Sequence, residues 1–392
     1  MAFRILSLDG GGTWALLEAM ALQDLFPDRS GHEILRQFDL AVANSGGSIV
    51  LAGLVLDMTP AQILGLFEDS KKRQAIFWKK FWLEGFLSRH VPIFPRYGAA
   101  KKRIGLGEVM GPRGNISLAF WPRQPGWPTG PSGDRVRLLV VTFDYDRLRE
   151  EMLRSYDVGN IGASAETISL VDAVHASTNA PVTYFDAPAF VGKRRYWDGA
   201  MGAYNNPLMA GVVDAISLGC DPMIIEALSL GAGTVRLLPS DLAQSDTPPD
   251  LQEDKVRPGI FTYAKVAAGC ITDDPPDAAT YTAHIVLRNI PNELGRVVRL
   301  SPVIQPVKES GTWTYPSGLS KAAFDALAQL GMDATRDEDV ALIEQLGAAW
   351  IHGGIPNQAI RARDDLEPDP GDPTYADGKR RWQAMTGTPP AR

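Results

Sequence analysis

The stretch Ile5-Leu6-Ser7-Leu8-Asp9-Gly10-Gly11-Gly12 lies near the start of the chain and decides its fold. Its first half belongs to a short apolar run, residues 3–8, that predicts a buried strand ended by the glycines. Successive glycines let backbone N–H groups turn toward one point, and the pattern of 15–26 predicts a helix N-terminus behind them. We therefore expect an anion site for a phosphate or for the oxyanion of an ester's tetrahedral intermediate. A glycine-rich turn without a ligand is the alternative.

The composition excludes several classes of protein. The chain has 392 residues, of which 45% are apolar and 22% charged, so it has ample material for a buried core and is not a disordered protein. A formal net charge of −7 argues against general binding of DNA or RNA. Cys220 and Cys270 provide neither a disulfide framework nor a metal-ligand spacing.

Apolar patterns alternate between strands and helices along the first part of the chain. Strands are expected over 3–8 and 38–43, and helices over 15–26, over 49–56 and after the capping residue Thr59. This order predicts an α/β fold whose mainly parallel sheet is covered by helices on both faces. Further strands are predicted over 136–142, 226–230, 284–287 and 297–300, and further helices over 170–177, 207–218, 319–332 and 337–351.

The segment Ala43-Asn44-Ser45-Gly46-Gly47 lies between a predicted strand and a predicted buried helix. A serine on such a sharp turn projects its hydroxyl, and the dipole of the following helix points at it. The segment departs from G-x-S-x-G by one methyl group, at Ala43. Taken alone, it also fits an ordinary Ser-Gly-Gly turn.

A third segment, Tyr196-Trp197-Asp198-Gly199-Ala200, places an aspartate where a predicted strand ends. An unperturbed aspartate titrates near pH ~4, and burial raises its pKa and makes it a better base for a serine. Taken alone, an Asp-Gly pair indicates a turn.

A dinucleotide site fits the glycine segment less well than an oxyanion site. Gly10, Gly12 and Ala15 match the G-x-G-x-x-G/A spacing. That site, however, needs an acidic residue at the end of the next strand, where this chain has Asn44-Ser45.

Taken in order, the three segments resemble the patatin-like phospholipase family, which shows D-G-G-G-x-[R/K]-G, G-x-S-x-G and D-G-[G/A]. Residues 176–185, 205–207 and 228–233 are similar to three further segments of that family, and the resemblance covers about residues 3–235. Two residues depart from the first motif, because Trp14-Ala15 stands where the family has a basic residue and a glycine.

The resemblance implies a patatin-like three-layer α/β fold and a lipid acyl hydrolase with a Ser–Asp dyad. Ser45 would be the nucleophile, Asp198 the base, and the N–H groups of Gly10, Gly11 and Gly12 the oxyanion hole. Gly47, Gly199 and Ala200 would support the motifs. Neither a metal nor an organic cofactor is implied.

A Ser-His-Asp triad is the alternative to this dyad. In the order serine, acid, histidine it would use His284 or His352, and neither stands in a catalytic context. A third histidine, His175, lies in an alanine-rich predicted helix and is expected to be packed.

The resemblance also implies one main domain. Residues 1–363 are expected to form a single patatin-like α/β domain, with its motifs in 3–235, an insertion or lid in 68–135 and an extension in 240–363. Residues 364–392 are polar and proline-rich and are predicted to form a disordered tail.

The segment 68–103 carries ten Lys or Arg and three Asp or Glu, a local net charge of +7. Its aromatic residues fall on one half of a helical wheel and most of its charged residues on the other, a pattern typical of a helix at an anionic lipid surface. The alternative is that these aromatic residues pack on the rest of the domain and do not contact lipid. The candidate membrane contacts are Phe77, Trp78, Phe81 and Trp82.

The expected function is a phospholipase A-type hydrolase that is cytoplasmic and acts on the surface of phospholipid membranes. The start of the chain lacks the apolar length of a signal peptide, and the uncharged stretch 40–56 is interrupted by polar residues and glycines. Some bacterial relatives in the family are effectors of anti-phage defence, so activation by a cyclic nucleotide and a homo-oligomer are further expectations. An esterase for soluble acyl esters and a non-catalytic lipid- or nucleotide-binding protein are the alternatives.

Overall fold

The computed structural model describes residues 2–77, 96–157, 167–181, 184–233, 276–287, 295–303, 307–309, 312–314, 318–328, 330–358 and 371–387. Within these residues, an eight-stranded sheet forms the centre of the molecule. Its strands are β1 (Phe3–Leu8), β2 (Leu40–Ala43), β3 (Arg137–Asp144), β4 (Arg149–Arg154), β5 (Ala189–Val191), β6 (Arg194–Asp198), β7 (Ile225–Leu230) and β8 (Val297–Leu300). Their order is β5-β6-β3-β2-β1-β7-β8, with β4 paired to β3 beside this path. A separate hairpin joins β9 (Val307–Glu309) and β10 (Thr312–Thr314).

The pairing of the strands brings three chemical segments to one edge of the sheet. β1, β2, β3, β7 and β8 are parallel, whereas β4, β5 and β6 pair antiparallel, so the predicted mainly parallel sheet is confirmed. Ala43 at the end of β2 lies opposite both Leu8 and Val140. β6 runs back along β3 until Asp198 lies opposite Thr142. Asp198 therefore lies at the same height in the sheet as the residues that follow Ala43.

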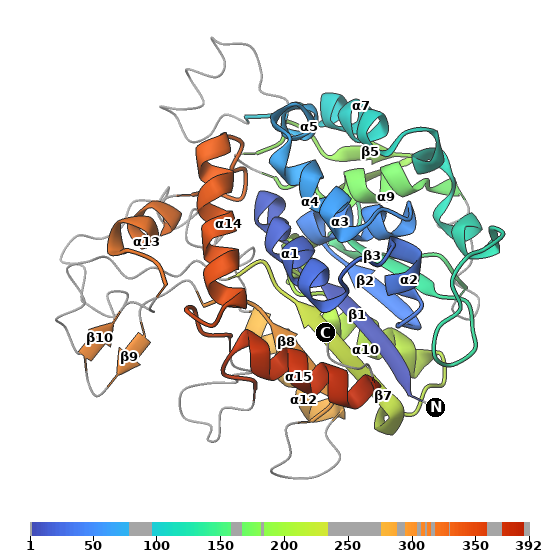
Figure 1. The fold of residues 1–392 in the computed structure, drawn as a ribbon. Coiled ribbons are helices and arrows are strands. Elements are labelled where there is room, and N and C mark those ends of the chain that lie inside the picture. The colour runs from blue at the N-terminus through green and yellow to red at the C-terminus, as the bar shows by residue number, and fades with distance from the viewer. Residues whose placement is uncertain are drawn as a thin grey trace.

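Helices surround this sheet. They are α1 (Leu16–Leu25), α2 (Gly31–Leu35), α3 (Ser45–Val55), α4 (Pro60–Glu68), α5 (Ser70–Ile76), α7 (Ala99–Met110), α9 (Leu170–Ser177), α10 (Leu208–Ser217), α12 (Pro276–Leu287), α13 (Lys321–Ala328), α14 (Asp337–Ile351) and α15 (Tyr375–Thr386). α1, α3, α4 and α9 lie on one face of the sheet, and α10 and α12 lie on the other (Figure 1). The predicted helical layers on both faces are confirmed.

The core is divided into two apolar clusters, one on each face of the sheet. In β1, Leu6 and Leu8 belong to the cluster beneath α1 and α3, whereas Phe3 and Ile5 belong to the cluster beneath α10. Successive side chains of a strand point to opposite faces, so a strand covered on both sides is apolar throughout. α3 is also apolar all round, and every residue of it is buried.

One predicted strand is wrong. Residues 284–287 form the last turn of α12 and not a strand. A short apolar run does not distinguish a buried strand from a buried helix, and here the alanine-rich residues before it continue as helix. The helix expected over 319–332 is also shorter than predicted, because α13 ends at Ala328.

The prediction of a disordered tail over 364–392 is wrong for residues 371–387, which contain α15. Trp382 of this helix stacks on the ring of Phe38, with ring centroids 5.6 Å apart. The hydroxyl of Tyr375 donates to a backbone carbonyl of α1 at 3.2 Å. Two buried aromatic side chains therefore fix a helix whose other residues are mostly polar.

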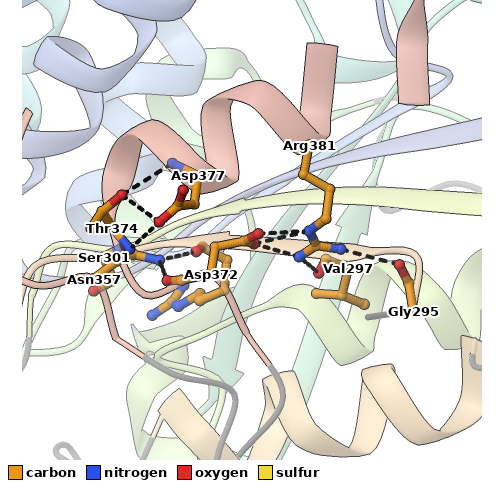
Figure 2. Close-up of polar contacts among 9 residues, drawn as sticks. Gly295, Val297, Ser301, Asn357, Asp372, Thr374, Asp377 and Arg381 are labelled. Atoms are coloured by element: carbon orange, nitrogen blue, oxygen red, sulfur yellow. Dashed lines mark hydrogen bonds and ion pairs between the residues drawn. The ribbon is translucent and has the colours of Figure 1, made fainter. Parts of the chain in front are cut away.

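Polar contacts fasten α15 to β8 (Figure 2). The guanidinium of Arg381 donates to the carbonyl oxygens of Gly295 at 3.1 Å and Val297 at 2.6 Å. It also forms a bidentate ion pair with Asp372, which is 3% exposed. Because β8 is next to β7, this end of the chain packs on the same sheet as the first strand.

Candidate active site

Ser45 is the first residue of α3, directly after the turn that follows β2. Its φ of 44° lies in the left-handed region, which a serine rarely adopts. The sharp connection between strand and helix imposes this conformation, which is typical of the turns that carry nucleophiles. The backbone N–H of Ser45 donates to Ser177 Oγ at 2.9 Å, and the residue is 5% exposed.

Two glycines after Ser45 allow the Asp9–Gly12 loop to pack on the start of α3. A Cβ added to Gly46 would lie 2.4 Å from the carbonyl oxygen of Gly12, and one added to Gly47 would lie 2.5 Å from that of Asp9. The N–H of Gly47 donates to the same Asp9 carbonyl at 3.0 Å. Any side chain at either position would push the glycine loop away from the serine.

Asp198 is buried beside Ser45 at the end of β6. Its Oδ1 accepts hydrogen bonds from the N–H of Ala200 at 2.9 Å and from Asn44 Nδ2 at 3.1 Å. Burial raises the pKa of its carboxyl. Hydrogen bonding from Ser45, Ala200 and Asn44 and the charge of Lys102 lower this pKa in part, and the net direction is upward.

Asn44 and Ser177 hold the serine and the aspartate in one network. Ser177 Oγ donates to the carbonyl of Val141 at 2.7 Å while it accepts from the N–H of Ser45. A Cβ added to Gly199 would lie only 2.5 Å from Asn44 Oδ1, so the residue after Asp198 must be a glycine here. Asn44 therefore positions the carboxylate of Asp198, and Ser177 positions the backbone of Ser45.

Three backbone N–H groups near Ser45 have no hydrogen-bond acceptor within the part of the chain that the structure describes. They belong to Gly11, Gly12 and Gly46. The Gly12 nitrogen lies 2.8 Å from the position that a Cβ of Gly46 would take, so the loop and the helix start adjoin. The prediction that Gly10 contributes an oxyanion donor is wrong, because its N–H donates to the Asn205 carbonyl at 2.7 Å.

Asp9 fixes the glycine loop to the far strand of the sheet. Its two carboxylate oxygens accept from Arg299 of β8 at 3.0 and 2.5 Å, and both side chains are 2% exposed. Arg299 also donates to Ser229 Oγ at 2.8 Å. Burial, together with the nearby charge of Asp9, raises the pKa of Glu18 in α1, which favours the neutral form of that neighbour.

Trp14, which departs from the family motif, contacts a segment far along the chain. Its indole N–H donates to the carbonyl of Gly331 at 3.2 Å, and the N–H of Thr13 donates to the carbonyl of Met332 at 2.9 Å. A Cβ on Gly12 would lie 2.3 Å from the same Met332 oxygen. The segment around Met332 therefore braces the glycine loop from outside.

A cavity opens at Ser45, and Lys102 of α7 lies in its wall. Lys102 is fully buried, and its Nζ donates to the His175 carbonyl at 2.9 Å and to Thr178 Oγ1 at 3.1 Å. The same nitrogen lies 4.1 Å from the ring centroid of Phe185. Burial lowers the pKa of Lys102, and the charge of Asp198 acts in the opposite direction.

The histidines proposed for a triad lie elsewhere. His284 belongs to α12, on the opposite face of the sheet from α3, and His352 caps the end of α14. His175 is buried in α9, and burial lowers its pKa to about 2. Within the described residues, the side-chain bonds of Asp198 involve no histidine.

Three of the four candidate membrane contacts, Trp78, Phe81 and Trp82, lie outside the described residues. Phe77 is half-buried, packs on the ring of Tyr97 with centroids 5.5 Å apart, and lines the cavity at Ser45. Among the helices that the structure describes, none combines the length and apolarity needed to cross a membrane.

The sequence did not single out four residues that complete the site: Asn44, Gly46, Lys102 and Ser177. The role of Gly46 could have been predicted from its position, because the residue after a nucleophile on such a turn commonly supplies an oxyanion N–H. Asn44 and Ser177 lie in quoted segments but had no assigned role. Lys102 is one of three consecutive basic residues, and nothing in that run marks it as buried.

Comparisons with known proteins identify a matching family. Residues 6–212, more than half of the chain, match the family Patatin-like phospholipase. No curated protein matches. Among solved structures, VipD from Legionella pneumophila is 14% identical, with 89% of this chain and 67% of VipD covered and a TM-score of 0.36. The type III effector protein ExoU is 11% identical, with 88% of this chain and 53% of ExoU covered and a TM-score of 0.27.

This chain thus spans about half the length of ExoU. The family match contains both the serine turn and the aspartate that the fold places beside it. The resemblance drawn from the motifs is confirmed: the chain belongs to the patatin-like phospholipase family.

Proposed function

We propose that this protein hydrolyses acyl ester bonds of membrane phospholipids with a Ser45–Asp198 dyad. One observation carries the proposal: a strained serine and a buried, hydrogen-bonded carboxyl lie together beneath free backbone N–H groups. The products are a free fatty acid and a lysolipid. Family membership supports a lipid acyl hydrolase. The contacts of Ser45 and Asp198 support the dyad.

In the first step, Ser45 Oγ attacks the carbonyl carbon of the ester while its proton moves to Asp198. The negative charge that develops on the carbonyl oxygen is held by the N–H groups of Gly11, Gly12 and Gly46. One such donor typically contributes about 3–4 kcal/mol to lowering the barrier. Collapse of the tetrahedral intermediate breaks the ester bond, and the leaving alkoxide takes the proton from Asp198.

In the second step, water releases the fatty acid. Asp198 accepts a proton from the water, whose oxygen attacks the acyl-serine carbonyl, and then returns that proton to Ser45 Oγ. The same N–H groups hold the second oxyanion. Burial suits Asp198 to this work because it raises the pKa of the carboxyl and so makes it a stronger base.

Two substitutions test the dyad. Ser45→Ala and Asp198→Asn should each lower fatty-acid release from phospholipid vesicles by at least about a thousandfold. Asparagine keeps an oxygen that can accept from the N–H of Ala200, so the local cap of Asp198 is retained. Matched controls are Ser217→Ala, at an exposed end of α10, and Asp146→Asn, whose exposed carboxylate pairs with Arg195.

The controls should keep full activity, and all four variants should keep the melting temperature of the unaltered protein within a few degrees. Hydrolysis that survives either dyad substitution refutes the dyad. Hydrolysis of short soluble esters without release from vesicles supports the esterase alternative instead. Vesicle binding that persists through both substitutions, with no hydrolysis by the unaltered protein, supports a non-catalytic lipid-binding protein.

Activation by a cyclic nucleotide and a role in anti-phage defence stay predictions. The same vesicle assay, run with and without cyclic mononucleotides and dinucleotides, tests the activation. A homo-oligomer is tested by light scattering of the purified protein in the same buffers.

A further inference from the structure

A buried carboxylate that the proposed mechanism does not use lies beside the cavity at Ser45. Asp333 belongs to the connection between α13 and α14, far beyond the family match over residues 6–212. Its side chain is 9% exposed, and its Oδ2 accepts from the hydroxyl of Tyr97 at 2.6 Å. Arg96 Nη1 donates to the same oxygen at 2.9 Å. Asp333 is therefore tied to the residues that precede α7.

Tyr97 is a fixed anchor for this carboxylate. Its N–H donates to the Tyr184 carbonyl at 2.8 Å, and its own carbonyl accepts from the N–H of Asp186 at 3.1 Å. Its ring packs on Phe77 and Phe185, with centroids 5.5 and 5.7 Å apart. Tyr184, Phe77 and Phe185 all line the cavity. The hydroxyl of Tyr97 therefore has a fixed position relative to the cavity wall.

Met332, the neighbour of Asp333 in the chain, contacts the glycine loop. Its carbonyl accepts from the N–H of Thr13 at 2.9 Å and leaves no room for a Cβ on Gly12. Met332 and Gly12 both line the cavity. A movement of Asp333 would therefore displace the carbonyl on which the glycine loop is packed.

Residues 330–336 belong to neither a helix nor a strand. The hydrogen bonds of a regular element therefore do not hold the Met332 carbonyl, and side-chain contacts such as the Asp333–Tyr97 bond decide where it lies. Burial raises the pKa of the Tyr97 hydroxyl, so that hydroxyl keeps the proton that it donates to Asp333.

We propose that Asp333 is a positioning residue for the oxyanion hole, which it holds in place through the Met332 carbonyl. This inference rests on the proposed function, because the position of the glycine loop affects catalysis only if the loop binds an oxyanion. Donors that are fixed before the reaction stabilise the transition state without reorganisation, and loss of one whole donor lowers kcat by about 10²–10³-fold. A loop that keeps its donors but is no longer fixed should lose less, about tenfold.

A similar trio of side chains on the other face of the sheet provides a matched control. The hydroxyl of Tyr156 donates to Asp214 Oδ2, and Arg154 Nε donates to Asp214 Oδ1 at 2.8 Å. The Asp214 side chain is 5% exposed and belongs to α10, on the face opposite α3. Tyr156→Phe is therefore the control for Tyr97→Phe, because each substitution removes one hydroxyl from a buried carboxylate.

The variants that test Asp333 are Asp333→Ala, Asp333→Asn and Tyr97→Phe. The assay measures kcat and KM for p-nitrophenyl butyrate, together with the melting temperature of each variant. It also measures Ki for a short alkyl trifluoromethyl ketone, whose carbonyl oxygen becomes an oxyanion when Ser45 Oγ adds to the carbonyl carbon.

Asp333→Ala should lower kcat by about tenfold and Tyr97→Phe by about fivefold, with KM within about twofold of the unaltered protein. Ki should rise by the same factor as kcat falls, because the inhibitor adduct resembles the transition state. Asparagine can still accept from the Tyr97 hydroxyl, so Asp333→Asn should keep kcat within about threefold. The double variant Tyr97→Phe/Asp333→Ala should be no slower than Asp333→Ala alone, because both substitutions break the same bond.

Tyr156→Phe should keep kcat and Ki even if it lowers the melting temperature. An unchanged kcat in folded Tyr97→Phe overturns the inference and leaves the dyad standing, and so does an equal loss in the control. A kcat that rises also overturns it, and would show that this segment obstructs the cavity. If Asp333→Ala does not fold, Tyr97→Phe and its control decide. If the unaltered protein hydrolyses neither this ester nor vesicle lipid, the proposed function fails, and the positioning role fails with it.

Discussion

The segments that carry the family motifs and the segments that carry none meet at the same site, and they contribute different things to it. In the proposed mechanism, the motif segments supply the reacting atoms: the nucleophile, the base and the N–H groups of the oxyanion hole. The segments without motifs hold those atoms in place through Arg299 of β8, Lys102 of α7 and the carbonyls of Gly331 and Met332. The motifs that define the site are therefore local in the sequence, whereas its support comes from residues 290 and 317 positions away from the groups that they hold.

This difference has a physical origin. A nucleophile turn or a glycine loop needs particular residue types at fixed spacing, because each backbone conformation excludes most side chains. A supporting carbonyl can belong to any residue type, and a buried ion pair needs only one partner of each charge. Substitutions at supporting positions thus measure how much the chemistry depends on residues outside the motifs.

The largest effect is expected from Arg299→Met, which leaves the Asp9 carboxylate buried without its partner. Loss of one member of a buried ion pair typically costs about 3–5 kcal/mol of unfolding free energy. The glycine loop would also lose its tie to β8, so ester hydrolysis should fall together with stability. Urea denaturation followed by circular dichroism measures the first quantity, and release of p-nitrophenol measures the second.

A matched control lies at the other end of β1. Arg4 pairs with Glu226 at 2.9 Å, and these side chains are 15% and 16% exposed. Arg4→Met should cost only about 1 kcal/mol and leave hydrolysis unchanged. Equal losses in the two variants would show that the Asp9 pair has no special part in holding the site.

An intermediate effect is expected from Lys102→Met, which removes a buried positive charge near Asp198. Asp198 accepts a proton only when it is ionised, so activity falls as the pH drops through its pKa. The charge of Lys102 lowers that pKa, and its removal therefore raises it. The acidic limb of the kcat/KM profile should move to higher pH, with about a tenfold loss on the acidic side for each unit of the shift.

The control for this profile is Arg103→Met, the next residue of α7, whose side chain is 45% exposed and pairs with Asp172 at 2.7 Å. Its profile should coincide with that of the unaltered protein. An acidic limb that stays in place after Lys102→Met would mean that Lys102 only fills space in the wall of the cavity.

The smallest effect is expected from Trp14→Phe, which removes the indole N–H that donates to the Gly331 carbonyl. Loss of one such bond should lower the unfolding free energy by about 1 kcal/mol. Because the bond braces the glycine loop, kcat should also fall severalfold. Trp127→Phe is the control, since the Trp127 indole donates to the Val136 carbonyl at 2.9 Å and is equally buried. If kcat changes alike in both variants, the brace has no bearing on catalysis.

Much of the fold could be predicted because buried elements have strong apolar patterns. α9, α14 and β8 have the predicted bounds, and α3 was recognised because it is apolar all round. β4 was missed, since Arg149–Arg154 is rich in charged residues and pairs at the side of β3. The strand expected to end at Asp198 is β6. α15 was missed because its buried face is narrow: it consists of Tyr375, Gly378, Trp382 and Met385 among mostly polar residues.

The site was predictable to the extent that motifs describe it. Ser45 and Asp198 were named from their turns, and the structure brings them together. The engaged N–H of Gly10 could not be foreseen, because its acceptor is a backbone carbonyl, that of Asn205. The burial of Lys102 is equally invisible in the sequence, because it results from the packing of α7 on α9.

The ion pair between Asp9 and Arg299 has a consequence for how the protein is made. The ribosome adds Asp9 to the chain 290 residues before Arg299. During most of its synthesis, the polypeptide therefore lacks the ion pair that holds the glycine loop. Lipid cleavage should begin only after β8 has been translated and has docked. Under the proposed function, a nascent chain that is still attached to the ribosome would therefore not yet cleave lipids.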